Sequence, residues 1–278
     1  MKNFIADLKR SWKERPFIWS ELHGDIEKKV SLPAGGRVLV LGPHPDDPEC
    51  AAVTARCLMQ SGCDLWYTIV SMSPSGVENR YAEKWGRNSP ASLEERKSEI
   101  RRLEQVSAAE MFGVKKERLA FLGIEETKAL DSPENLTVIR EHLESVAPDV
   151  VLMPAGNDSN RTHAWVHRSF RQCIPHVIRG RGTPVVALYN EDPKTIGMRH
   201  DLYVLFGDDR GEWKRSLLRA HGSQQERNMH SRGIGFDDRI LGMNRLRYSL
   251  LRGSTSVGDG PEKYAEVFEI EWFDVPDK

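Results

Sequence analysis

Four side chains that can bind a metal or transfer a proton stand within six residues of one another: His44, Asp46, Asp47 and Glu49. They directly follow the apolar run RVLVLGP (37–43), and prolines occupy positions 43, 45 and 48. Each proline fixes its own φ and keeps the preceding residue extended, so the loop holds these side chains on a stiff backbone. The segment is a candidate site for metal binding or acid–base chemistry.

A purely structural role explains part of this segment. Asp47 is placed to cap a following helix, with Pro48 in the first helical position and Glu49 favourable to the helix dipole. Capping accounts for one carboxylate and leaves His44 and Asp46 unexplained at the end of a strand. We therefore favour a functional site.

A second group of candidate ligands follows the apolar run APDVVLMP (147–154). His163 and His167 are four residues apart, which places both imidazoles on one face of a helix. Asp158 is placed to orient a ligand histidine from behind. Two histidines at this spacing are often ordinary surface or packing residues. Here both clusters follow buried strands, so they are expected to converge at one edge of a sheet.

The remaining pattern alternates strands and helices. We predict strands at 37–43, 64–72, 118–123, 147–154, 184–190, 201–206 and 265–273, the last at a sheet edge because its polarity alternates. We predict helices at 49–60, 92–112, 133–145, 163–178, 211–221 and 237–251. Ser92 with Glu95 has capping-box spacing, Gly113 suits a helix end, and Ser132-Pro133 suits a helix start. This order predicts an α/β, Rossmann-like, doubly wound and mostly parallel sheet with helices on both faces, and with C-terminal α/β additions.

The chain is expected to hold one such domain, residues 36–278, after an N-terminal helical appendage, residues 1–35. In that appendage Phe4, Ile5, Leu8 and Trp12 fall on one helical face. No internal repeat or flexible linker interrupts the domain.

Composition narrows the function classes. The chain has 40 Lys and Arg against 41 Asp and Glu, so no broad positive charge favours nucleic acid. No apolar run is long enough for a membrane span, and the charged N-terminus does not resemble a secretory signal, so we expect a cytoplasmic protein. The four cysteines lack paired spacing and are expected to be reduced and mostly buried.

His44, Asp47 and one of the two distal histidines would form a three-ligand nitrogen and oxygen site, the composition of a catalytic zinc with one open position. Water bound to such a metal is a nucleophile at neutral pH. Asp46 is the natural general base, and the remaining histidine can polarise a carbonyl and protonate a leaving amine.

The segment VLVLGPHPDDPE resembles the (A/P)HPDDE motif of the PIG-L / LmbE-like family of zinc-dependent N-acetyl-sugar deacetylases. The resemblance extends over roughly residues 36–230. Glu99-Ile-Arg101-Arg-Leu-Glu104 is similar to the family's Arg-x-x-Glu helix, and SVAPDVVLMPAGND to the strand before its second histidine motif. Trp213-Lys214 through His221-Gly-Ser223-Gln224 is similar to its Lys…His-x-Ser-Gln segment.

The resemblance implies His44 and Asp47 as zinc ligands and Asp46 as general base. It also implies that the last histidine of an HPDH-like motif binds the metal. That motif corresponds here to His163-Ala-Trp-Val-His167, so His167 is expected to bind zinc and His163 to stabilise the oxyanion. Arg101 matches an arginine that can face the substrate in relatives, and a solvated charge on the helix surface is the alternative. Pro48, inserted before Glu49, leaves the role of Glu49 open, and His221 is expected to be a packed residue.

The leading hypothesis is a zinc-dependent hydrolase that removes the acetyl group from an N-acetylglucosamine-type amino-sugar conjugate. Iron(II) or another divalent metal would suit the same ligands. Two alternatives stay open, a hydrolase of a different N-acyl amide and a catalytically impaired metal- or sugar-binding homologue. A dinucleotide enzyme is disfavoured because Pro-His-Pro stands where glycines would be needed. The expected partner is a small amino-sugar conjugate, without nucleic acid, and a homo-oligomer is left open.

Overall fold

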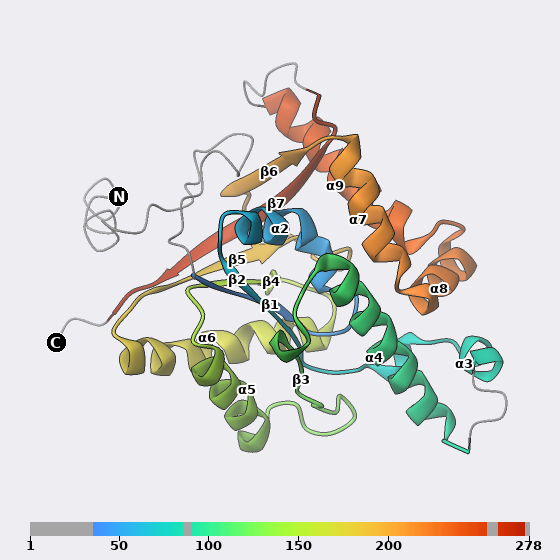
Figure 1. Cartoon of the computed structure of the whole chain (residues 1–278), viewed down its shortest axis with the longest axis horizontal. Helices are drawn as coiled ribbons and strands as arrows, with labels where there is room; N and C mark the ends of the chain where they lie inside the picture. Colours follow the sequence, from blue (N-terminus) through green and yellow to red (C-terminus); the bar gives the residue numbers. More distant parts are fainter. Residues whose placement is uncertain (1–35, 86–89, 255–260, 276–278) are drawn as a thin grey trace.

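The computed structural model describes residues 36–85, 90–254 and 261–275. The expected N-terminal helix lies outside these residues, so the division at residue 35 stays a prediction. The described chain forms a seven-stranded sheet with the order β3-β2-β1-β4-β5-β7-β6 (Figure 1). Its strands are β1 (Arg37–Gly42), β2 (Asp64–Ile69), β3 (Leu119–Phe121), β4 (Val150–Pro154), β5 (Val185–Asn190), β6 (Leu202–Phe206) and β7 (Tyr264–Phe273). The α/β, mostly parallel class predicted from the sequence is confirmed.

Helices cover both faces of the sheet. Side chains of α2 (Ala52–Gln60), α4 (Leu93–Phe112) and α7 (Asp208–Arg219) share one apolar cluster with the strands. Those of α5 (Pro133–Val146) and α6 (Arg161–Arg181) share another on the opposite face (Figure 1). Every residue of β4 and β5 is buried, as is β1 after the exposed Arg37, which explains the apolar runs in their sequences. The helices are α2 (Ala52–Gln60), α3 (Asn79–Trp85), α4 (Leu93–Phe112), α5 (Pro133–Val146), α6 (Arg161–Arg181), α7 (Asp208–Arg219), α8 (Gly222–Arg232) and α9 (Phe236–Ser254), with short 3-10 turns at Pro48–Ala51, Pro74–Gly76 and Lys116–Arg118.

Local sequence signals fix several helix ends as predicted. Ser92 and Glu95 form a reciprocal capping box at the start of α4, and Gly113 ends that helix with φ +94°. Ser132 caps α5 through the amide of Asn135. Two further helices, α3 and α8, were not predicted, because one is short and the other strongly polar.

The last strand, β7, departs from the expected edge position. It lies between β5 and β6 and is antiparallel to both. Tyr264–Phe268 pairs with β6, whereas residues 269–273 pair only with β5 among the described strands. Residues 269–273 therefore have a paired strand on one side only among the described strands, which is the situation of an edge strand.

The sheet order places a topological switch between β1 and β4. The chain runs from β1 outward to β2 and β3, and then returns to β4 on the other side of β1. In open parallel sheets, ligands bind in the crevice at the carboxyl ends of the strands beside such a switch. Within the described residues, no helix combines the length and apolar character needed to cross a membrane.

Candidate metal centre and active site

The two predicted clusters meet at this switch. His44 and Asp47 lie in the loop after β1, and His163 lies in the first turn of α6, after β4. All three side chains are buried, with exposed fractions of 1–6%. The stiff loop of prolines and the short connection from β4 to α6 therefore hold the three side chains at one point.

One atom from each side chain forms a nearly equilateral triangle. His44 Nδ1 lies 3.3 Å from Asp47 Oδ2, and His163 Nε2 lies 3.2 Å from the same oxygen. The two imidazole nitrogens are 3.1 Å apart. Ligand atoms about 2.0–2.1 Å from a tetrahedral zinc stand about 3.3 Å apart. The triangle therefore fits a divalent metal with a fourth position left for water or substrate.

Each imidazole is oriented from behind by a carboxylate. His44 Nε2 lies 2.5 Å from Glu126 Oε1, and His163 Nδ1 lies 3.1 Å from Asp158 Oδ2. Such partners select the tautomer and ring orientation of a ligand histidine. Asp158 has the orienting position expected from the sequence. Glu126 was not predicted from the sequence. It lies in the loop after β3, whose carboxyl end is at the same edge of the sheet as that of β1.

The charges around His163 are those of a cation site. Burial lowers the pKa of His163, but Asp47, with Asp158 and Asp192, raises it to about 10. Burial raises the pKa of Asp192 to about 7, against the opposing effect of His163. Carboxylates thus surround the imidazoles on several sides, and a divalent ion in the triangle would balance this negative charge.

Asp46 stands beside the triangle in an unusual backbone conformation. Its φ is +92°, a region that residues with a side chain seldom adopt. Its amide donates a hydrogen bond to Gln105 Oε1 at 3.1 Å, and its carboxylate pairs with Arg101. Burial raises the pKa of Asp46, with Arg101 acting in the opposite direction. The strained turn separates Asp46 from Asp47, so that neighbouring carboxylates have different partners.

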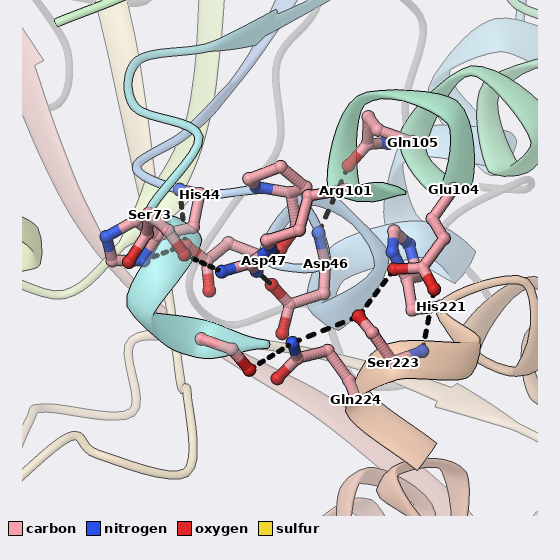
Figure 2. Close-up of polar contacts among 12 residues, drawn as sticks. His44, Asp46, Asp47, Ser73, Arg101, Glu104, Gln105, His221, Ser223 and Gln224 are labelled. Carbon is pink, nitrogen blue, oxygen red and sulfur yellow. Dashed lines mark hydrogen bonds and ion pairs between the residues drawn. The ribbon is translucent and has the colours of Figure 1, made fainter. Parts of the chain in front are cut away.

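Arg101 contacts the loop that carries Asp46, whereas the sequence predicted a contact with the substrate. It is 4% exposed and donates to the carbonyl oxygens of Pro45 and Ser73 as well as to Asp46 (Figure 2). These contacts hold the loop and its carboxylate from the α4 side. The geometry therefore favours a positioning role for Arg101 over the direct substrate contact expected from the sequence.

The structure reverses the expected order of the α6 histidines. His163 joins His44 and Asp47, whereas the His167 ring packs 4.5 Å from that of Tyr189. His167 also lies against Gly156, where an added Cβ would stand 2.3 Å from Nδ1. The two histidines share a helix face, but four residues advance His167 by about 6 Å along the axis, away from the triangle.

This placement realigns the motif proposed from the sequence. If its last histidine is the one at the metal, the four-residue motif corresponds to Asn160-Arg161-Thr162-His163, with the usual length. Asn160 then occupies the first position, and its side chain caps α6 through the amide of Thr162. In the described site, α6 thus offers one imidazole to the triangle and none for the oxyanion role expected of His163.

The remaining motif residues form a buried network beneath Asp46. Glu49 bonds Gln105 at 3.0 Å and lies 3.2 Å from His221 Nε2. Glu104 accepts hydrogen bonds from the amide and hydroxyl of Ser223 (Figure 2). Glu49, left open by the sequence, thus links α4 to the start of α8. His221 is packed, as expected.

A hollow opens above Asp46 and Asp47, with a volume of about 490 Å³ including the space open to solvent. Its walls come from the loop after β5 and from α8 and α9, which bring residues such as Asp192, Gln224 and Phe236 over the carboxylates. The hollow is open to solvent, so a ligand can reach the two carboxylates from outside.

Solved structures share this fold at low sequence identity. 4-Carboxy-2-hydroxymuconate hydratase (GalB) from Pseudomonas putida KT2440 has a TM-score of 0.65 and 17% identity, over 87% of this chain and 99% of its own. N,N'-diacetylchitobiose deacetylase from Pyrococcus horikoshii has a TM-score of 0.56 and 16% identity, over 96% and 92%. The conserved protein TT1542 from Thermus thermophilus has a TM-score of 0.59 and 19% identity, over 83% and 92%.

A family model agrees with the site. The model of PIG-L, described as GlcNAc-PI de-N-acetylase, matches residues 39–174, which include all three corners of the triangle together with Asp46. No curated protein matches the chain. The resemblance seen in the sequence is confirmed: residues 39–174 match the model of the PIG-L family.

Proposed function

We propose that the protein is a metal-dependent deacetylase that hydrolyses the N-acetyl group of an N-acetylglucosamine-type conjugate to acetate and a free amine. The observation that carries this proposal is the triangle of His44, Asp47 and His163 with Asp46 beside it. The PIG-L match and the fold shared with deacetylases support the same reaction.

His44, Asp47 and His163 would hold the metal, with zinc or iron(II) the candidates for this donor set. When bound, the ion supplies Lewis-acid chemistry, which activates water and polarises the amide carbonyl. Glu126 and Asp158 orient the two imidazoles toward it.

Asp46 is the proposed general base. It lines the hollow next to a ligand, and the attacking water can pass a proton to its carboxylate. The motif realignment leaves no second α6 histidine at the triangle, so the protonated Asp46 is also placed to return that proton to the leaving nitrogen. The amide C–N bond breaks, and water contributes OH to acetate and H to the amine.

Arg101 and Gln105 position Asp46 by holding its carboxylate and its amide. They fix the conformation with φ +92°, which an isolated aspartate would rarely adopt. Their role is to keep the base directed toward the hollow rather than to contact the substrate.

The test measures acetate release from N-acetylglucosamine conjugates, together with metal content. Asp46→Asn should lower kcat by about 10²–10⁴-fold while retaining wild-type metal content, because it removes the proton acceptor and leaves the triangle. Asp209→Asn, at an exposed site on α7, is the matched control and should keep full turnover.

Two results would contradict the proposal. Wild-type turnover by Asp46→Asn would exclude this residue as the base. If the metal-loaded wild type releases no acetate from any of the N-acetylglucosamine conjugates, a non-catalytic homologue or another reaction on the same fold would be favoured.

A further inference from the structure

One wall of the hollow above Asp46 is strongly basic. Four cationic side chains line it: Lys194 after β5, Arg227 and Arg232 from α8, and Arg239 from α9. Arg239 is half-buried, and the other three are exposed. All four follow residue 174, so they lie outside the segment that matches the family.

The three arginines of this wall donate to neutral partners. Arg227 donates to the carbonyl oxygen of Gly76, Arg232 to Ser231 Oγ, and Arg239 to Asn228 and to the carbonyl oxygen of Pro193. The two contacts of Arg239 are long, at 3.4 and 3.3 Å. Across residues 36–85, 90–254 and 261–275, none of the four forms an ion pair with a carboxylate.

The carboxylates of the hollow are engaged elsewhere. Asp46 pairs with Arg101, and Asp47 lies within 3.3 Å of both imidazoles. Asp192 accepts a hydrogen bond from the amide of Lys194 at 2.7 Å and lies 3.8 Å from His163 Nδ1. Asp192 and Asp46 offset part of the positive charge of Arg239 and Lys194 through space. Neither carboxylate forms an ion pair with the four cations in the described residues, and a bound divalent ion would add positive charge to the hollow.

Like charges also crowd one another on this wall. Burial lowers the pKa of Arg239, and the charge of Arg232 lowers it further. Asp192 and Asp46 act on the pKa of Arg239 in the opposite direction. A further anion bound near Arg232 and Arg239 would favour both charged guanidinium groups. Guanidinium groups bind carboxylate and phosphate through paired, charge-assisted hydrogen bonds.

We infer that the substrate carries an oxyanion, a carboxylate or a phosphate, that binds to Arg227, Arg232 and Arg239 while its acylated nitrogen reaches Asp46. Lys194 adds a fourth positive charge at the rim. This inference rests on the proposed function, because it specifies the substrate class of the same hollow.

Binding by matched sugars tests the inference without turnover. The probes are the methyl glycoside of N-acetylglucosamine, which is neutral, N-acetylglucosamine 1-phosphate and 6-phosphate, and N-acetylmuramic acid, which carries a carboxylate. Calorimetric titration uses the full-length, metal-loaded protein with Asp46→Asn to prevent hydrolysis. At least one charged sugar should bind about 100-fold more tightly than the neutral one, and this ratio should fall as salt screens the charges.

Variants assign the preference to the wall. Arg232→Gln and Arg239→Gln should each lower the ratio of charged to neutral affinity by about tenfold, the cost of one charge-assisted contact. The matched control is Arg179→Gln, an exposed arginine in the last turn of α6 that donates to His176. It should keep the wild-type ratio.

The outcomes are distinct. Preference for phosphate alone, or for carboxylate alone, supports the inference and identifies the anion. Equal binding of charged and neutral sugars overturns it, as does a preference that survives both arginine variants. If charged sugars bind selectively and wild type releases no acetate from them, the deacetylase proposal fails and the anion site stands. If the protein releases acetate but shows no preference for charged sugars, the deacetylase proposal stands and the anion site fails.

Discussion

The two histidines of α6 differ only in their depth along one helix. His163 lies in the first turn, where α6 leaves the sheet edge, and His167 lies one turn farther on, against Gly156 and Tyr189. Two histidines on one helix face can bind the same metal only if both imidazoles also lie close to it along the helix axis. The close approach of His167 to Gly156 gives it a packing role.

The first prediction separates the two residues by metal content. His163→Ala should lose bound zinc or iron, because it removes one corner of the triangle, and His167→Ala should retain it while becoming less stable. Elemental analysis after reconstitution and dialysis, with a thermal melt of each variant, makes the comparison. Loss of metal from His167→Ala with retention by His163→Ala would restore the order expected from the sequence.

The sequence predicted the β1 loop at the level of single residues but did not predict Glu126. His44, Asp46 and Asp47 share one short proline-rich segment, so their proximity is local. Glu126 contacts His44 across 82 residues, and only the packing of the β3 loop brings them together. Choosing between His163 and His167 likewise required the position at which α6 begins.

At the scale of elements, a buried ion pair holds the C-terminal additions to the sheet. Lys214 of α7 lies 2.7 Å from Glu266 of β7 and donates to the carbonyl oxygen of Cys50 at 2.7 Å. Glu266 also accepts from the amides of Val53 and Thr54 at the start of α2. One pair thus joins β7, α7 and α2.

The second prediction concerns this pair. Lys214→Met should lower the free energy of unfolding by about 3–5 kcal/mol, because Glu266 would be left buried without its cation. Denaturant unfolding provides the measurement. The matched control is Lys263→Met, which breaks the exposed pair with Asp208 and should leave the unfolding midpoint unchanged. A midpoint for Lys214→Met equal to that of the control would show that the buried pair does not stabilise these elements.

At the scale of the whole molecule, the candidate metal joins distant parts of the chain. His44 and His163 are 119 residues apart and come from loops on either side of the switch between β1 and β4. The unfolded chain cannot keep these ligands together, so a metal bound there favours the folded state.

The third prediction follows from this linkage. Saturation with zinc or iron(II) at about 100 times Kd should stabilise the fold by about 2.7 kcal/mol, which raises Tm by about 5–10 °C. Scanning calorimetry with and without a chelator makes the measurement, and His163→Ala serves as the control. An equal shift in that variant, or none in wild type, would contradict metal binding by the triangle.

Much of the architecture was predictable because apolar runs and caps are local signals. Every strand of the described sheet overlaps a predicted segment, and the capping of α4 and α5 agrees with the sequence. The insertion of β7 between β5 and β6 was not predictable, because a strand's partners depend on the path of the whole chain. Helix α8, which lines the hollow, was not predicted because its sequence is mostly polar.

The separation of the triangle from the basic wall has a consequence for evolvability. The metal ligands and Asp46 lie within residues 39–174, and the four cations lie in the later third of the chain. Point mutations at these four positions can therefore change which molecules bind while the residues of the triangle and Asp46 stay the same. Exchange of the whole C-terminal region is more costly, because it would also replace His221 and Ser223, the partners of Glu49 and Glu104.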